Sequence, residues 1–99
     1  MSVLMAQAKI KAENVTDVQA AGKKMFAALN AAQPEGFRYA WCLLPDGETF
    51  VALVQVDDGV ENPLPGLPEY RELQEVLKDW LAEPSNSQPL TVIGSYRLF

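Results

Sequence analysis

Residues 37–56, FRYAWCLLPDGETFVALVQV, decide the fold. The stretch reads as two strands joined at Pro45-Asp46-Gly47-Glu48, because Asp-Gly between two strand-like runs is a strong signal for a β-hairpin. If Leu44 lies opposite Thr49, Trp41 pairs with Ala52, and the pairing of every other residue follows. A loop one residue longer or shorter would change which residues of the second strand share a face with Trp41.

Both faces of this predicted hairpin carry apolar side chains. With the register above, one face consists of Phe37, Tyr39, Trp41, Leu43, Phe50, Ala52, Val54 and Val56. The other face consists of Arg38, Ala40, Cys42, Leu44, Thr49, Val51, Leu53 and Gln55. An antiparallel sheet with helices on one side normally turns polar residues to water on its free side. A second apolar face therefore predicts an interaction surface, and the pattern leaves open which face meets the helices.

The flanking sequence predicts two further strands and two helices. Alternating apolar residues predict a strand over residues 2–11. Asn14 is a good helix cap, and apolar residues then recur every three or four positions until Pro34 ends the helix. A proline-rich connection over residues 57–68 leads to a second helix over residues 68–81. A polar loop over residues 83–89 then precedes a closing strand over residues 90–99.

This element order predicts an α+β fold of the ferredoxin-like βαββαβ type. Four antiparallel strands form one sheet, and both helices lie on one of its faces. A chain of 99 residues, of which 48% are hydrophobic, has the length and the apolar content for a single domain over residues 1–99. Because the second sheet face is also apolar, we expect two sheets to pack face to face in a symmetric homodimer.

The composition argues against several classes of partner. The formal net charge is −5, and the lysines and arginines are scattered, so we expect no nucleic acid and no membrane partner. The apolar run over residues 3–6 is too short for a signal peptide or a membrane span. Cys42 is the single cysteine and cannot form an intrachain disulfide. These features predict a cytoplasmic protein, and we expect Cys42 to be a buried, inert thiol.

The length, the element order and the double-sided sheet resemble the dimeric α+β barrel superfamily, in particular the antibiotic biosynthesis monooxygenase-like proteins. The hairpin at Pro45-Asp46-Gly47 and the closing stretch VIGSYRLF, residues 92–99, carry this resemblance. It implies a homodimer through the sheet face and a pocket between the sheet and the helices of one subunit. It further implies that relatives include cofactor-independent monooxygenases acting on polycyclic phenols. No set of catalytic residues matches position by position, so the catalytic residues remain unknown.

The chain contains no histidine, and this restricts its chemistry. Without imidazole there is no ordinary Ser-His or Cys-His nucleophile pair and no histidine ligand for a metal or a haem. The haem-degrading relatives rely on a histidine, so that branch is disfavoured. The glycines match neither GxGxxG nor GxxxxGK[ST], the loops that hold nucleotide phosphates. We therefore expect no metal and no cofactor.

Four residues are candidates for a ligand pocket: Tyr39, Trp41, Tyr70 and Arg97. Tyr39 and Trp41 belong to an aromatic row that either walls a flat ligand or packs in the core or the dimer. Tyr70 either packs in the core or lies at a pocket mouth, and Arg97 either binds an anionic or phenolate ligand or forms an ion pair. Small residues such as Ala6 and Ala52 either leave a void beside this row or let a helix approach closely. The function that we expect is binding, or cofactor-independent oxidation, of a small aromatic molecule. The alternative is a non-catalytic dimeric binding or assembly module.

Overall fold

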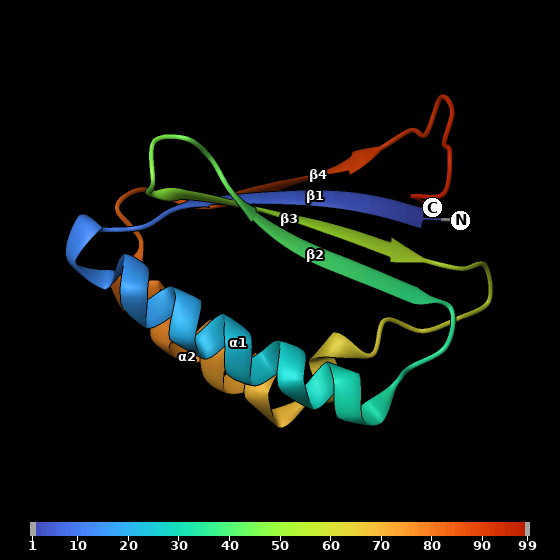
Figure 1. The fold of residues 1–99 in the computed structure, drawn as a ribbon, viewed down its shortest axis with the longest axis horizontal. Coiled ribbons are helices and arrows are strands. Elements are labelled where there is room, and N and C mark those ends of the chain that lie inside the picture. The colour runs from blue at the N-terminus through green and yellow to red at the C-terminus, as the bar shows by residue number, and fades with distance from the viewer. Residues whose placement is uncertain (1, 99) are drawn as a thin grey trace.

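The computed structural model describes residues 2–98 and contains one antiparallel sheet with both helices on one face (Figure 1). The strands are β1 (Ser2–Lys9), β2 (Phe37–Leu43), β3 (Thr49–Val56) and β4 (Asn86–Leu90), in the order β2-β3-β1-β4. The helices are α1 (Val15–Ala32) and α2 (Pro68–Trp80), preceded by the short 3-10 helices η1 (Ala12–Asn14) and η2 (Leu64–Gly66). This arrangement confirms the predicted ferredoxin-like βαββαβ fold.

The β2–β3 hairpin has the predicted register. Trp41 pairs with Ala52, and the backbone N–H of Leu44 donates to the carbonyl of Thr49 at 2.9 Å. The loop between them contains a turn in which the N–H of Gly47, at φ 73°, donates to the carbonyl of Leu44 at 2.9 Å. This positive φ favours glycine, which explains why the Asp-Gly signal was informative.

Asp46 holds the hairpin loop together. Its Oδ1 accepts hydrogen bonds from the backbone N–H groups of Glu48 and Thr49, both at 2.9 Å. Its Oδ2 accepts from the hydroxyl of Thr49 at 2.6 Å. The hydrogen bond from the Thr49 hydroxyl, followed by those from the two N–H groups, lowers the pKa of the Asp46 carboxyl. The loop geometry is therefore encoded within six residues.

The hairpin face that carries Tyr39 and Trp41 meets the helices. The ring of Phe26 in α1 lies 5.3 Å from that of Tyr39 and 5.8 Å from that of Trp41, centroid to centroid. Gly22 of α1 is buried against the indole of Trp41. The open question of which face meets the helices is thus answered, and the side of the sheet that carries Arg38, Ala40 and Cys42 forms the outer face.

The closing strand lies earlier in the chain than predicted. β4 spans Asn86–Leu90, most of the stretch expected to be a polar loop, whereas residues 91–98 form no regular element and Phe99 lies outside the described residues. The cause is the end of α2, where Leu81 bridges to Ile10. From there the chain runs antiparallel to β1, and the last residue of β4, Leu90, pairs with Val3. β1 offers almost no partner beyond that point, so the apolar residues that follow have nothing to pair with.

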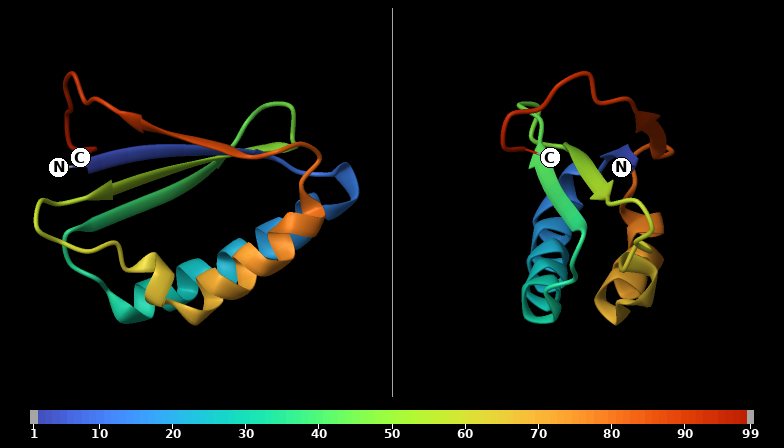
Figure 2. Two further views of the ribbon diagram at one scale, coloured as in Figure 1. Left: turned by 180° about the vertical axis from the view of Figure 1, so that it is seen from behind. Right: turned by 90° about the vertical axis from the view of Figure 1, so that its right-hand side faces the viewer.

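The core is built from both helices and the helix-facing side of the sheet. Its most buried apolar side chains are Val18 and Met25 of α1, Leu73 of α2, Leu64 of η2, and Ile10 directly after β1. α1 and α2 lie side by side beneath the sheet (Figure 2). Over residues 2–98, neither helix combines the length and apolarity needed to cross a bilayer.

Candidate functional site

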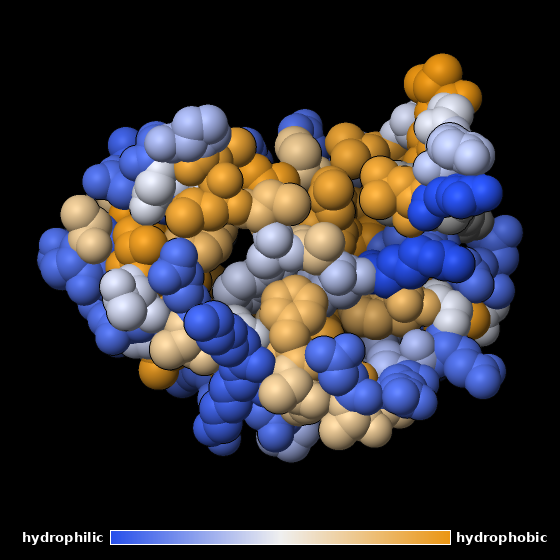
Figure 3. Space-filling view, viewed as in Figure 1, coloured by the Kyte–Doolittle hydropathy of each residue, from blue (hydrophilic) through white to orange (hydrophobic). Residues whose placement is uncertain are grey.

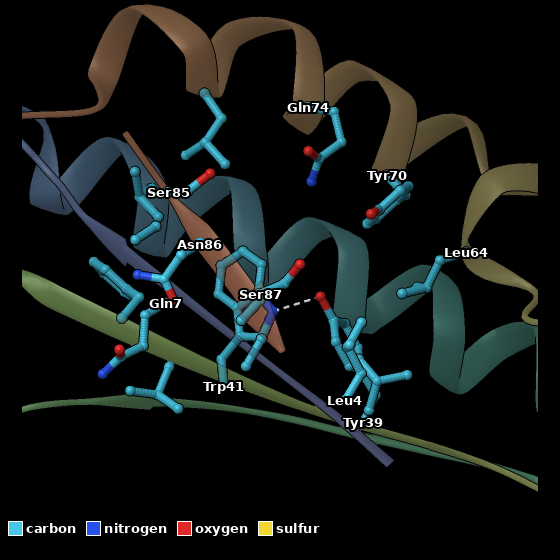
Figure 4. A pocket seen from close by; sticks show the side chains of 18 of the residues that line it. Leu4, Gln7, Tyr39, Trp41, Leu64, Tyr70, Gln74, Ser85, Asn86 and Ser87 are labelled. Atoms are coloured by element: carbon cyan, nitrogen blue, oxygen red, sulfur yellow. Dashed lines mark hydrogen bonds between the residues drawn. The ribbon is translucent and has the colours of Figure 1, made fainter. Parts of the chain in front are cut away.

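A cavity of about 310 Å³ lies between the sheet and the helices (Figure 4). Its sheet side is lined by Leu4, Ala6 and Ala8 of β1, Tyr39 and Trp41 of β2, and Phe50, Ala52 and Val54 of β3. Its helix side is lined chiefly by Leu64, Tyr70, Gln74 and Leu77. Three alanines on the sheet side leave room that larger residues would fill. The void that small residues near the aromatic row allow is therefore present.

Tyr39 and Trp41 form a hydrogen-bonded pair at the cavity wall. They are two residues apart on one strand, so their side chains share a face. The indole Nε1–H of Trp41 donates to the hydroxyl oxygen of Tyr39 at 2.7 Å. Because the oxygen acts as the acceptor in this contact, its own hydrogen remains available to donate to a second group. Tyr39 is thereby prepared to hydrogen-bond a ligand oxygen.

Tyr39 remains a neutral phenol across the physiological range. Burial raises the pKa of Tyr39 to about 12, the hydrogen bond from Trp41 opposes this rise, and Tyr70 adds a small further increase. A hydroxyl with so high a pKa donates hydrogen bonds but does not accept a proton from a substrate at neutral pH. Tyr39 can therefore stabilise developing negative charge, and it cannot serve as the general base.

Further polar groups reach the cavity from α2 and β4. Tyr70 and Gln74 are four residues apart on α2, so both side chains lie on the helix face that points toward the sheet (Figure 4). Ser87 lies opposite Ala6 in the β1–β4 pairing and therefore on the helix-facing side of the sheet. Asn62 lies at the rim, where its Oδ1 accepts the N–H of Leu64 at 3.0 Å. All of these groups are uncharged.

The structure brings three of the four predicted pocket residues together. Tyr39, Trp41 and Tyr70 line the same cavity. Arg97 lies in the segment after β4, with its guanidinium carbon 5.1 Å from the ring centroid of Tyr96, and it does not line the cavity as described by residues 2–98. The sequence reasoning missed Gln74, which its four-residue spacing from Tyr70 could have indicated.

A second hollow, of about 420 Å³, lies between α1 and the β2–β3 hairpin. It is lined by Gln19, Gly22, Lys23, Phe26, Trp41, Cys42, Leu43 and Phe50. Trp41 and Phe50 line both spaces, so these two rings form a shared wall. Figure 3 shows a hollow between the sheet and the helices on this side of the molecule.

The outer face carries a polar cluster and the cysteine. Nη1 of Arg38 donates to Oε1 of Gln55 at 2.6 Å, and Nε2 of Gln55 donates to Oδ1 of Asp57 at 2.7 Å. Arg38 also lies 3.8 Å from Asp57, which places it in an ion pair. Cys42 is exposed, so the expectation of a buried thiol is wrong. In the described part of the chain, no three Cys, Asp or Glu side chains cluster as a metal site requires.

Comparisons with known proteins address the fold. No protein-family model and no curated protein sequence matches the chain. A solved structure from Nitrosomonas europaea, assigned as an antibiotic biosynthesis monooxygenase, is similar, with a TM-score of 0.73 at 17% identity, covering 95% of this chain and 100% of that chain. A solved structure from Deinococcus radiodurans with the same assignment is also similar, with a TM-score of 0.71 at 13% identity, covering 100% of this chain and 99% of that chain.

A third similar structure is a mutant of SnoaB, a cofactor-independent oxygenase from Streptomyces nogalater. Its TM-score is 0.70 at 14% identity, and the match covers 97% of this chain and 96% of that chain. The TM-scores show a common fold. At identities this low they say nothing about activity, which has to be argued from the site. The chain has the ferredoxin-like fold of the antibiotic biosynthesis monooxygenase-like proteins.

Proposed function

We propose that the protein binds a small aromatic molecule in the cavity between its sheet and its helices, and oxidises it with O₂ without a metal or a flavin. The cavity itself carries this proposal. Its volume of about 310 Å³ falls at the small end of the range typical of ligand sites, and the rings of Trp41 and Phe50 offer flat walls. The fold similarity to a cofactor-independent oxygenase supports the choice of this reaction.

The reaction that suits this site converts an electron-rich phenol into a quinone. A ring carbon para to the hydroxyl donates electrons to O₂ and forms a new C–O bond, which gives a hydroperoxide. The O–O bond then breaks, one oxygen becomes the new carbonyl, and the other leaves as water. The phenol and ring C–H hydrogens balance that water, and O₂ accepts the four electrons that the ring loses.

The residues of the cavity contribute orientation and electrostatics to this reaction. The hydroxyl of Tyr39 donates to the substrate oxygen on which negative charge develops, and Trp41 holds that hydroxyl in place at 2.7 Å. Tyr70 and Gln74 contact the substrate from α2. With Tyr39 unable to take the phenol proton, the substrate enters the cavity as the neutral phenol, and its proton passes to water in the course of the reaction.

The same protein is proposed to be a cytoplasmic homodimer that pairs through the outer sheet face. Ala40 and Leu53 lie on this face, and Figure 3 shows apolar side chains gathered over the sheet side of the molecule. The segment after β4 crosses on this same side, opposite the helices (Figure 2). Ile93 and Tyr96 in this segment are 94% and 83% exposed. A second copy would remove this apolar surface from water.

One observation favours a non-catalytic binding module instead. None of the cavity-lining residues within residues 2–98 carries a carboxylate, an amine or a guanidinium, so the cavity itself supplies no proton acceptor near neutral pH. A site of this kind can bind an aromatic molecule without transforming it. Such a module would show saturable binding without consumption of O₂.

A two-stage experiment tests the proposal. First, thermal shift with a set of small phenols and quinols should raise the melting temperature, because a ligand of the native state stabilises it. Second, an oxygen electrode should detect O₂ uptake with the phenols that bind, matched by quinone absorbance. Binding without O₂ uptake would support the module, and the absence of any shift would overturn the proposal that the cavity takes aromatic ligands.

A further inference from the structure

We infer that the cavity selects ligands without a formal charge, and rejects carboxylates and ammonium ions of the same shape. This inference rests on the proposed function, since it names the class of aromatic molecule that the site takes. The polar groups in the cavity include Tyr39, Tyr70, Gln74 and Ser87. Each of these is a hydroxyl or an amide.

No charged side chain of either helix lines the cavity, and two ion pairs lie on the exposed surface of the helices. Lys24 of α1 pairs with Glu72 of α2 at 3.3 Å, and their side chains are 68% and 67% exposed. Glu75 pairs with Lys78 at 3.4 Å, with side chains 79% and 71% exposed. Exposed pairs of this kind are strongly screened by water and offer little to a buried ligand charge.

Desolvation makes this lining selective. A carboxylate or an ammonium that enters an apolar space loses its hydration, and it recovers that loss only beside an opposite charge or a full set of hydrogen bonds. The walls here are mostly aliphatic and aromatic side chains with some amides and hydroxyls, and no compensating charge is present among the lining residues. A neutral hydroxyl or carbonyl, by contrast, is satisfied by one or two of the donors and acceptors available.

Gln74 is the residue through which this selectivity can be reversed. It lies on α2 with its amide directed toward the cavity (Figure 4), and it is otherwise exposed enough to tolerate substitution. Gln74→Lys would place a cation where the cavity has none. Glu75→Gln changes the net charge of the protein by the same amount, but on a side chain that is 79% exposed and faces solvent. Comparing the two variants therefore distinguishes the effect of a charge inside the cavity from the effect of the net charge of the protein.

The experiment measures the affinity of two matched probes, 2-naphthamide and 2-naphthoate, by calorimetry at pH 7. The two probes have the same ring system and nearly the same shape, and only the second is charged. We expect the native protein to bind the amide at least about tenfold more tightly than the carboxylate, which corresponds to about 1.4 kcal/mol. Gln74→Lys should bind the carboxylate more tightly than the native protein does, and Glu75→Gln should keep the native preference.

Each result has a definite meaning. Equal binding of amide and carboxylate, or unchanged selectivity in Gln74→Lys, would overturn the inference and leave the proposal of an aromatic ligand intact. A gain of carboxylate affinity in Glu75→Gln equal to that in Gln74→Lys would also overturn it, because the effect would then come from net charge. If neither probe binds any of the three proteins, the inference is overturned, and the proposed function is decided separately by the thermal shift with phenols and quinols.

Discussion

Gly22 of α1 lies directly against the indole of Trp41 in β2. A Cβ atom added at Gly22 would lie 2.6 Å from Cζ3 and 2.9 Å from Cε3 of the ring, which is closer than such atoms approach in proteins. Trp41 also forms part of the wall between the cavity and the hollow beside α1. The position of one ring thus depends on the absence of a side chain on the helix opposite.

Gly22→Ala should therefore displace Trp41 and reshape the cavity. Alanine favours a helix over glycine by about 1 kcal/mol, yet overpacking against the indole costs about 1–3 kcal/mol. We expect a net loss of stability in urea denaturation, a shift in tryptophan fluorescence and weaker binding of aromatic probes. Gly66→Ala is the control, because no atom lies within 4 Å of a Cβ at Gly66. Equal effects of the two variants would contradict the steric argument.

Tyr39→Phe should weaken both the fold and the site. The change removes the acceptor of the Trp41 Nε1–H, and because this donor is only part-buried, the loss costs less than the about 1–3 kcal/mol of a fully buried donor without a partner. It also removes the hydroxyl that we place on the ligand oxygen. We expect a lower melting temperature and a loss of affinity for hydroxylated aromatics that exceeds the loss for unsubstituted ones. Equal losses for the two ligand types would show that the hydroxyl does not contact the ligand.

The raised pKa of Tyr39 predicts a specific dependence of stability on alkaline pH. Its pKa is about 12 in the folded state, against an ordinary value of 10.0. Between these two values the unfolded chain loses the proton while the folded chain retains it, so stability falls as pH rises from about 10 to about 12. Urea denaturation in this range should show a steeper decline for the native protein than for Tyr39→Phe. Parallel declines would contradict the assignment.

Asp46→Ala should destabilise the β2–β3 hairpin without touching the cavity. The variant loses the hydrogen bonds that Asp46 accepts from Glu48 and Thr49. Because these bonds lower the pKa of Asp46, its contribution is present at neutral pH and is lost as the pH falls through that lowered pKa. The difference in melting temperature between native protein and variant should therefore be larger at pH 7 than at pH 2. A constant difference would contradict the role of the carboxylate.

Ala40→Glu should dissociate the proposed homodimer. Ala40 is exposed on the outer face of β2 in the isolated subunit, so a glutamate there leaves the subunit core unchanged. In a face-to-face dimer it would bury two like charges, which is unfavourable. Light scattering should return the dimer mass for the native protein and the monomer mass for Ala40→Glu. Val76→Glu on α2, also at an exposed apolar residue, is the control and should remain dimeric.

The neighbouring Cys42 provides an independent reading of the same interface. Its thiol is exposed in the isolated subunit and lies on the outer face. Alkylation should therefore be slow in the native dimer and faster in Ala40→Glu. Equal rates in both proteins would argue against an interface on this face.

The hairpin and the helices were determined by local sequence. The register of β2 and β3 follows from a loop whose hydrogen bonds join Leu44, Asp46, Gly47, Glu48 and Thr49, so no distant residue is needed to define it. The two helices follow from apolar spacing and from the prolines that border them. Tyr39, Trp41 and Tyr70 could be selected as pocket candidates because aromatic residues on a double-sided hairpin and at a helix start were visible in the pattern.

The position of β4 and the existence of the cavity were decided only by the tertiary structure. Residues 90–99 alternate as a strand does. However, the Ile10–Leu81 bridge places the chain beside β1 already at the end of α2, so residues 86–90 use up the pairing positions on β1. Leu90 pairs with Val3, and only Ser2 of β1 remains beyond that pair. Alanines at positions 6, 8 and 52 are compatible with either a close helix or an open space. Whether the alanines adjoin a helix or an open space depends on the separation of α2 from the sheet. That separation results from packing among residues far apart in the chain, so the local sequence does not reveal it.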